Sequence, residues 1–195
     1  EEIMELVAAI ETAKRPIFYT GGGVVNSGPA ASQLLRELVD ATGFPITSTL
    51  MGLGAYPASG KHWIGMLGMH GLYEANMAMH DCDVMLCVGA RFDDRITGVT
   101  SKFCPYAQII HIDIDPASIS KTINADIPIV GGAKQVLSEM NKLLDSAEPA
   151  SNQAALESWW NTIKSWQAQN SFAYAQKGDL ITPMAAVEEH YRCTE

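Results

Sequence analysis

The stretch PIFYTGGG, residues 16–23, predicts a buried β-strand that ends in a glycine turn. Its short β-prone run begins at a proline and stops at three successive glycines, which is typical of a strand followed by a tight turn. Apolar residues recur at helical spacing ahead of it, over residues 3–10, and behind it, over residues 29–43. Helix, strand, turn and helix in this order indicate an α/β unit.

The remainder of the chain continues this alternation. Further strands are expected at residues 45–49, 83–89, 108–114 and 127–130, and helices at residues 72–80 and 134–144. Strands that alternate with helices favour a parallel sheet covered on both faces. We therefore predict an α/β fold with a Rossmann-like doubly wound parallel sheet. Residues 51–71, rich in glycine and methionine, are expected to form a long functional loop without regular structure.

Composition narrows the function classes. The chain of 195 residues has 13 Lys and Arg against 22 Asp and Glu, a formal charge of −9, which argues against nucleic acid or an anionic membrane surface as the partner. No apolar stretch approaches the roughly 18 residues of a membrane span, and no signal peptide is visible. The cysteines at positions 82, 87, 104 and 193 have no metal-ligand spacing. We expect reduced core thiols and no metal site.

The chain is about 1.3 times as long as a typical domain of about 150 residues, so one domain with an appendage is expected. Residues 146–153, SAEPASNQ, have the composition of a linker. We predict a main domain over residues 1–147 and a linker with helices over residues 148–195. The start at Glu1 and the short final helix pattern after Ile181 suggest a piece of a longer polypeptide.

The appendage carries an apolar stripe with helical spacing. Its members are Leu156, Trp159, Trp160, Ile163 and Trp166. Such a stripe is more typical of a helix packed on the core. The alternative is that it docks on another domain.

Ligands of open α/β sheets bind beyond the carboxyl ends of the strands, so the residues there are candidates. Gly21, Gly22 and Gly23 would let a backbone approach a phosphate or sugar, or they form only a tight turn. Asn26 stands where a G-x-G-x-x-G motif needs glycine, and Pro29 stands where a P-loop needs lysine. Neither nucleotide motif is therefore present.

Charged residues follow two other predicted strands. Residues 90–95, ARFDDR, are either a solvated charge run or an arginine fork for a pyrophosphate. In HIDID, residues 111–115, a period of two puts His111, Asp113 and Asp115 on one side, where a carboxylate can bind a ribose diol. A metal site on the same residues is the alternative, which is disfavoured because only one carboxylate would lie at the strand tip. Asp115 precedes Pro116 and is expected to cap a following helix. The methionines and His70 of the 51–71 loop suit a flat, partly apolar ligand.

Four strings in this order, STLMGLG at 48–54, LGMHG at 67–71, GARFDDR at 89–95 and HIDID at 111–115, closely resemble the central domain of the acetohydroxyacid synthase (acetolactate synthase) catalytic subunit family. The resemblance runs from about Pro16 to Leu144. It implies a central domain that holds FAD between two thiamine-diphosphate-binding domains. The family joins two 2-ketoacids, pyruvate with pyruvate or 2-ketobutyrate, with release of carbon dioxide in branched-chain amino acid biosynthesis, and its flavin performs no net redox step in that reaction.

The resemblance also implies roles for individual residues. The glycines at 21–23 should contact the ADP part of FAD, and Asp113 and Ile114 its adenosine end. The segments that should surround the ribityl chain, the flavin ring and the rest of the cofactor are Thr49, Leu50 and Met51; Leu67, Gly68, Met69 and His70; and Gly89, Ala90, Arg91, Asp93 and Arg95. Met69, Asp94 and Arg95 should also face the substrate channel, where inhibitors of the family bind. Gly131-Gly132 departs from the Gly-Asp that the family commonly shows there.

No catalytic residue of the family falls in this chain. The thiamine-diphosphate motif is absent, and the catalytic glutamate belongs to the amino-terminal domain. The resemblance thus implies a transferase that uses thiamine diphosphate and magnesium in its full-length form, and a fragment that is inactive alone. Its expected partners are its own two thiamine-binding domains, further catalytic subunits in a dimer or tetramer, and in some members a small regulatory subunit. A bacterial source would place it in the cytoplasm, and a plant source in a plastid.

Three alternatives stay open. A nicotinamide-binding dehydrogenase domain shares the fold class but should carry G-x-G-x-x-G. The central domain of another thiamine enzyme that binds FAD or ADP is a second possibility, which the Arg91 to Arg95 string disfavours. A non-enzymatic interaction module is supported only by the tryptophan stripe.

Overall fold

The computed structural model describes residues 2–145, 152–175, 178 and 180–194. Its centre is a six-stranded sheet in the order β3-β2-β1-β4-β5-β6, and every strand pair is parallel. The strands are β1 Pro16–Thr20, β2 Ile46–Ser48, β3 Trp63–Met66, β4 Val84–Val88, β5 Gln108–Asp113 and β6 Ile127–Val130. The predicted doubly wound parallel sheet is confirmed.

The strand order reverses direction beside β1. The chain builds outward through β2 and β3, then returns to place β4 on the other side of β1. Thr20 is paired with Val88, so the carboxyl ends of these two central strands lie level with each other. In a doubly wound sheet this reversal opens the crevice in which ligands bind.

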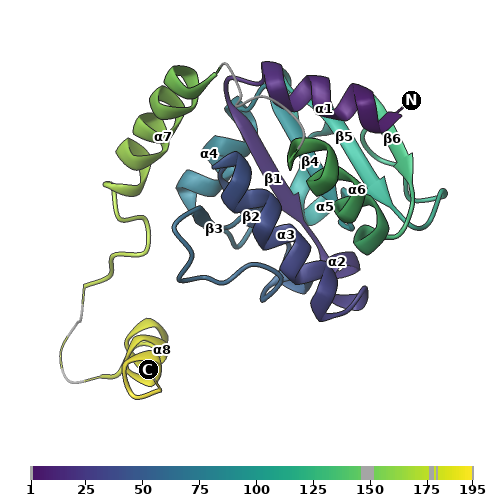
Figure 1. The fold of residues 1–195 in the computed structure, drawn as a ribbon. Coiled ribbons are helices and arrows are strands. Elements are labelled where there is room, and N and C mark those ends of the chain that lie inside the picture. Colours follow the sequence, from purple (N-terminus) through teal and green to yellow (C-terminus); the bar gives the residue numbers. More distant parts are fainter. Residues whose placement is uncertain (1, 146–151, 176–177, 179, 195) are drawn as a thin grey trace.

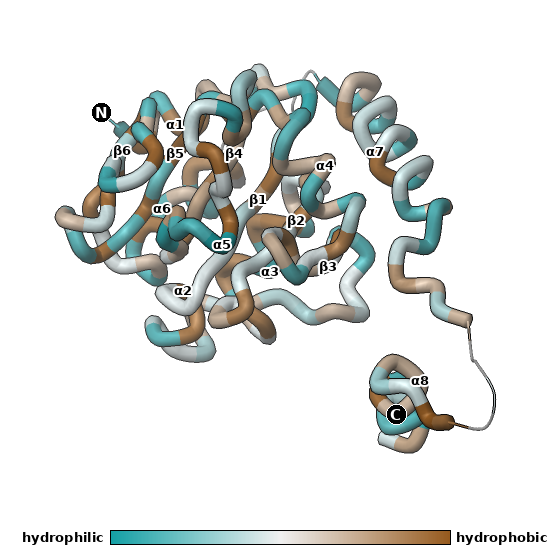
Figure 2. Tube along the Cα trace, turned by 180° about the vertical axis from the view of Figure 1, so that it is seen from behind, coloured by the Kyte–Doolittle hydropathy of each residue, from teal (hydrophilic) through white to brown (hydrophobic). Residues whose placement is uncertain are grey.

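Helices cover both faces of the sheet (Figures 1 and 2). One face is covered by α1 Glu2–Thr12, α3 Pro29–Thr42 and α6 Ala133–Asp145, and the other by α4 Tyr73–Asp81 and α7 Gln153–Gln167. Alternate side chains of β1 enter the two cores: Phe18 packs on the first face, and Ile17 and Tyr19 pack on the second. This burial on both faces explains why β1 has an uninterrupted apolar sequence.

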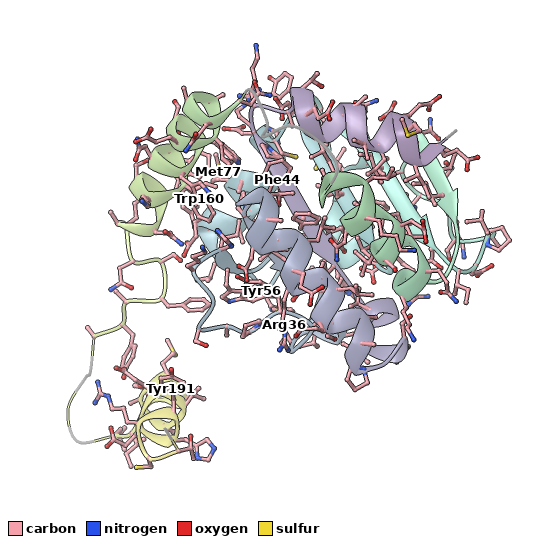
Figure 3. The ribbon with its side chains drawn as sticks, in the orientation of Figure 1. Arg36, Phe44, Tyr56, Met77, Trp160 and Tyr191 are labelled. Carbon is pink, nitrogen blue, oxygen red and sulfur yellow. The ribbon has the colours of Figure 1, made fainter. Side chains whose placement is uncertain are left out.

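The helix α7 contributes to the second core. Trp159 is 2% exposed and Ile163 is fully buried, and both belong to the cluster that contains Ile17 and Tyr19. Trp159 Nε1 donates to the Pro16 carbonyl at 3.0 Å, and Trp160 Nε1 donates to the Gly43 carbonyl at 2.8 Å. Trp160 points from α7 toward the α/β body (Figure 3). The core interpretation of the stripe is therefore confirmed, whereas the domain boundary at 147 and 148 stays a prediction.

Two local predictions are wrong. The segment 51–71 does not lack regular structure, because it contains the edge strand β3 and begins within the 3-10 turn η1, Leu50–Gly52. β3 is short, its pairing with β2 is irregular, and Gly65 has a φ of +91°, so the period-two signal is lost. Asp115 caps no helix, because residues 116–120 form a turn, in which the Asp115 carboxylate accepts from the Ala117 N–H at 2.9 Å and the Ser118 hydroxyl at 3.1 Å.

Shorter elements complete the chain. The glycine turn after β1 forms the short helix α2, Gly22–Asn26, and α5 spans Asp94–Thr97. The final helix, α8 Pro183–Arg192, begins at the expected Ile-Thr-Pro with Thr182 as its N-cap and lies apart from the α/β body (Figure 1). The predicted linker falls largely outside the described residues. Across the described ranges, no helix is both long and apolar enough to cross a membrane.

Candidate functional site

The loops that follow β1 and β4 touch each other at the point where the strand order reverses. Gly23 N–H donates to the Gly89 carbonyl at 2.9 Å, and a Cβ on Gly23 would lie 2.7 Å from Gly89 Cα. A Cβ on Gly21 would lie 2.5 Å from Ala90 Cα. Gly89 has a φ of +61°, in the region that favours glycine. Gly21, Gly23 and Gly89 are therefore required mainly because they allow the two loops to contact each other.

Gly22 differs from its neighbours because a side chain at this position would face the turn after β2. A Cβ there would lie 3.3 Å from Met51 Cβ. Thr49 holds that turn by accepting from the Gly52 N–H at 3.0 Å through its hydroxyl. Leu50 and Met51 are 68% and 75% exposed on this anchored turn. A fixed backbone that displays large apolar side chains suits a flat apolar ligand.

The loop after β3 is tied down on two sides. Gly68 N–H donates to Asn76 Oδ1 at 2.8 Å, and Asn76 Nδ2 donates back to the Gly68 carbonyl at 3.1 Å. Met69 N–H donates to the Arg95 carbonyl at 3.0 Å. Leu67 is buried, whereas Met69 and His70 are exposed. The structure thus brings the predicted channel residues Met69 and Arg95 together, and it identifies Asn76 as an anchor that sequence reasoning missed.

The loop after β4 is held by its carbonyl groups. Ala90 O accepts from His111 Nε2 at 2.9 Å and from Cys87 Sγ at 3.2 Å, and Arg91 O accepts from the Tyr19 hydroxyl at 3.3 Å. Two of the contacts are local: the Cys87 thiol lies three positions before Ala90, and Asp93 caps α5 by accepting from the Arg95 N–H at 3.1 Å. The contacts from His111 and Tyr19 are long-range, and the loop sequence itself gave no signal of them.

The predicted arginines are not neutralised by their neighbours in sequence. Arg91, Asp93, Asp94 and Arg95 are all exposed. Within the described part of the chain, neither arginine forms an ion pair. Their guanidinium groups are therefore available to an anionic ligand at this edge.

The two aspartates after β5 have different surroundings. Asp113 is half-buried, and its Oδ1 accepts from the Asp115 N–H at 2.8 Å. Both carboxylate oxygens of Asp115 accept bonds within its own turn. Gly131 N–H donates to the Asp113 carbonyl at 2.9 Å, so the paired glycines 131–132 lie beside this strand tip without a side chain. Asp113 is thus the better candidate for binding a diol, next to Ile114, which is 74% exposed.

Burial keeps the side chains beneath these loops uncharged near neutral pH. Burial raises the pKa of the Tyr19 phenol well above its usual range, and nearby Cys87 and Asp93 raise it further. Burial lowers the pKa of His111, against the opposing effects of its bond to Ala90 and of the Asp113 charge. The charge at this edge therefore comes from exposed arginines and aspartates.

Two hollows on the surface are separate from the predicted site residues. A hollow of about 630 Å³ lies against α2 and α3, and one of about 390 Å³ lies between α7 and the Lys14-Arg15 backbone at the amino ends of the strands. Neither is lined by a predicted site residue. The described ranges contain no group of three or more His, Cys, Asp or Glu side chains that could hold a metal ion.

The predicted residues thus gather along one edge of the sheet, at the ends of five strands from β3 to β5 in spatial order. This edge offers exposed apolar side chains, unpaired guanidinium groups and a strand-tip carboxylate. These three kinds of side chain fit a ligand that contains a flat ring, a diphosphate and a ribose, as FAD does.

Comparison with known proteins defines the class of this chain. Residues 3–140 match the family model of the thiamine pyrophosphate enzyme, central domain, and the chain belongs to this family.

The similar proteins are more particular. The chain is 45% identical over 194 residues to the acetolactate synthase isozyme 3 large subunit of Escherichia coli K12, covering 100% of the chain and 33% of that protein. It is 46% identical over 194 residues to the acetolactate synthase large subunit of Haemophilus influenzae, with the same coverage. It is 40% identical over 178 residues to acetolactate synthase of Mycobacterium avium, covering 91% of the chain and 28% of that protein. The chain thus spans about a third of the length of these relatives, and the resemblance seen in its motifs is confirmed.

Proposed function

We propose that this chain is the FAD-holding central part of an acetolactate synthase large subunit. The observation that carries the proposal is the convergence of the predicted segments on the strand-order reversal between β1 and β4. The similarity to acetolactate synthase large subunits along the whole chain supports it.

Different residues along this edge of the sheet would bind different parts of FAD. Leu50, Met51 and Met69 would cover the flavin ring with apolar surface. Arg91 and Arg95 would compensate the diphosphate charge, which an acidic protein otherwise repels. The Asp113 carboxylate would accept bonds from the ribose diol of the adenosine half. FAD, when bound, would supply the flavin ring, and Met69, Asp94 and Arg95 would face the substrate channel.

The chemistry on ketoacids belongs, in this proposal, to the whole polypeptide. Thiamine diphosphate and magnesium would be held by segments outside these 195 residues, in the chain's own thiamine-binding domains and in a dimer or tetramer of catalytic subunits, to which a small regulatory subunit could attach. The assembled enzyme would condense two 2-ketoacids with loss of carbon dioxide. Its place would be the cytoplasm of a bacterium, as for a relative of the bacterial enzymes above.

Equilibrium titration of the chain with FAD, followed by flavin absorbance and fluorescence, tests the proposal. We expect FAD to bind more tightly than NAD. Asp113→Asn should weaken FAD binding by about tenfold, because a charged acceptor contributes more than a neutral one. Asp115→Asn is the matched control, since its oxygens are used within the turn, and it should leave the affinity unchanged. Equal or tighter binding of NAD would favour the dehydrogenase alternative.

A further inference from the structure

The imidazole of His111 is buried beneath the loop that follows β4. His111 is fully buried on β5, between Cys87 of β4 and Pro128 of β6 in the strand register. Its ring packs edgewise on Phe92 with a centroid separation of 5.0 Å. Nε2 lies 2.9 Å from the Ala90 carbonyl oxygen, whereas Nδ1 has no hydrogen-bond partner among the described residues.

The geometry determines the state of this ring. A carbonyl oxygen only accepts, so Nε2 must carry the hydrogen that joins it to Ala90. Because burial keeps the ring neutral, Nδ1 then holds an unpartnered lone pair. A buried acceptor without a donor is destabilising, and an apolar side chain would avoid that cost. What the imidazole supplies at this position is therefore its bond to the Ala90 carbonyl.

That bond decides which way the loop's peptide groups point. In a trans peptide the C=O and the following N–H point in opposite directions. The Ala90 carbonyl is directed inward to His111 and Cys87, and the Arg91 carbonyl is directed inward to Tyr19. The N–H groups of Arg91 and Phe92 consequently point away from the core, and neither has an acceptor among the described residues.

These outward N–H groups lie at the strand-order reversal, next to the exposed Arg91 side chain. Adjacent backbone donors of this kind bind anionic groups. We propose that His111 is a positioning residue: by holding the Ala90 carbonyl inward, it presents the Arg91 backbone N–H, together with its guanidinium group, to the diphosphate of the ligand at this edge. This inference rests on the proposed FAD site, but the state of the ring and the direction of the loop do not require the ligand.

The test uses the full chain and three variants. His111→Gln retains a side-chain N–H donor that can reach the Ala90 carbonyl, whereas His111→Leu removes the donor and keeps an apolar side chain. His62→Gln is the matched control, because His62 is another buried histidine but contacts Asp40 and Tyr56 instead. We expect His111→Leu to weaken FAD binding by about tenfold, His111→Gln to recover most of the affinity, and His62→Gln to bind as the parent chain does.

Nitrogen-15 NMR without ligand provides an independent readout. The parent chain at neutral pH should show His111 protonated on Nε2 only, and His111→Leu should shift the Arg91 amide resonance while His111→Gln restores it. A ring protonated on Nδ1, or an unmoved Arg91 amide in a folded His111→Leu, would overturn the inference even if FAD binds. Absence of FAD binding to the parent chain would instead refute the proposed function. If His111→Leu does not fold, failure of His111→Gln to retain the parent affinity and Arg91 resonance overturns the inference.

Discussion

At the residue scale, Gly21 and Gly22 are adjacent but have different surroundings. A Cβ on Gly21 would lie 2.3 Å from the Gly89 carbonyl oxygen, in space that the backbone of residues 89 and 90 occupies, whereas a Cβ on Gly22 would lie no closer than 3.3 Å to any atom of Met51. We expect Gly21→Ala to lower the free energy of unfolding by roughly 3 kcal/mol through overpacking. Gly22→Ala should change it by less than about 1 kcal/mol, since alanine is favoured over glycine in a helix.

Urea denaturation of both glycine variants measures this difference. Equal stability losses would show that the two loops are not in the contact described for Gly21 and Gly89. Flavin titration of Gly22→Ala adds a second measurement, because we expect this variant to keep the fold while it changes the surface next to Met51.

Two buried histidines give the chain an acid-sensitive stability. Burial lowers the pKa of both His62 and His111 from the ordinary value of 6.5, with the Lys61 charge contributing at His62 and Asp40 opposing the shift there. The unfolded chain then binds more protons than the folded chain below pH about 6.5. The stability they confer is complete above that pH and is lost as the pH falls through the folded-state pKa values.

Urea midpoints measured from pH 7.5 down to pH 5 should therefore decrease, and His62→Gln should make that decrease shallower. A variant such as Thr162→Gln, at an exposed position of α7, serves as a control and should follow the parent curve. A pH dependence that is unchanged by His62→Gln would contradict the assignment to this histidine.

At the scale of elements, α4 positions the loop after β3 through one amide side chain. Asn76 makes reciprocal hydrogen bonds with the Gly68 backbone, so Asn76→Leu should leave both Gly68 groups without their partner. We expect a loss of about 1–3 kcal/mol in the free energy of unfolding. Hydrogen exchange at residues 67–70 should also become faster. Asn141→Leu, which removes a single bond to Leu34 between α6 and α3, is the control and should not affect exchange at those residues.

The helix α7 is an integral part of the second core. Trp159→Ala should lower the free energy of unfolding by about 3–5 kcal/mol, because it removes a buried ring and the bond to Pro16. Lys164→Ala on the exposed side of the same helix should change it by no more than about 0.5 kcal/mol. Thermal denaturation of both variants checks this, and equal midpoints would mean that α7 does not pack on the sheet.

At the scale of the whole molecule, the chain should bind cofactor without turning over substrate. With pyruvate, thiamine diphosphate and magnesium we expect no acetolactate, because the resemblance places the catalytic glutamate and the thiamine motif outside these residues. FAD at about 100 times its dissociation constant should still stabilise the fold by about 2.7 kcal/mol, seen as a rise in the thermal midpoint. Acetolactate formation by the pure chain would contradict the assignment of catalysis to segments outside these residues.

The sequence alone determined the fold class, the family and most of the strands. Strands that are buried on both faces, such as β1 and β4, have uninterrupted apolar sequences, and helices with one buried face repeat at helical spacing. The motif strings at 48–54, 67–71, 89–95 and 111–115 indicated the acetolactate synthase family without any coordinates. These are local patterns, so a reading along the chain detects them.

The tertiary structure alone decided which residues meet. Tyr19 bonds the Arg91 carbonyl, which lies 72 residues away in sequence, and His111 bonds the Ala90 carbonyl, which lies 21 residues away. Neither partner can therefore be predicted from the neighbouring sequence. The irregular edge strand β3 and the backbone partners of the α7 tryptophans, Pro16 and Gly43, likewise depend on contact with distant elements. Such contacts follow from strand order and register, which bring distant segments together only once the sheet has formed.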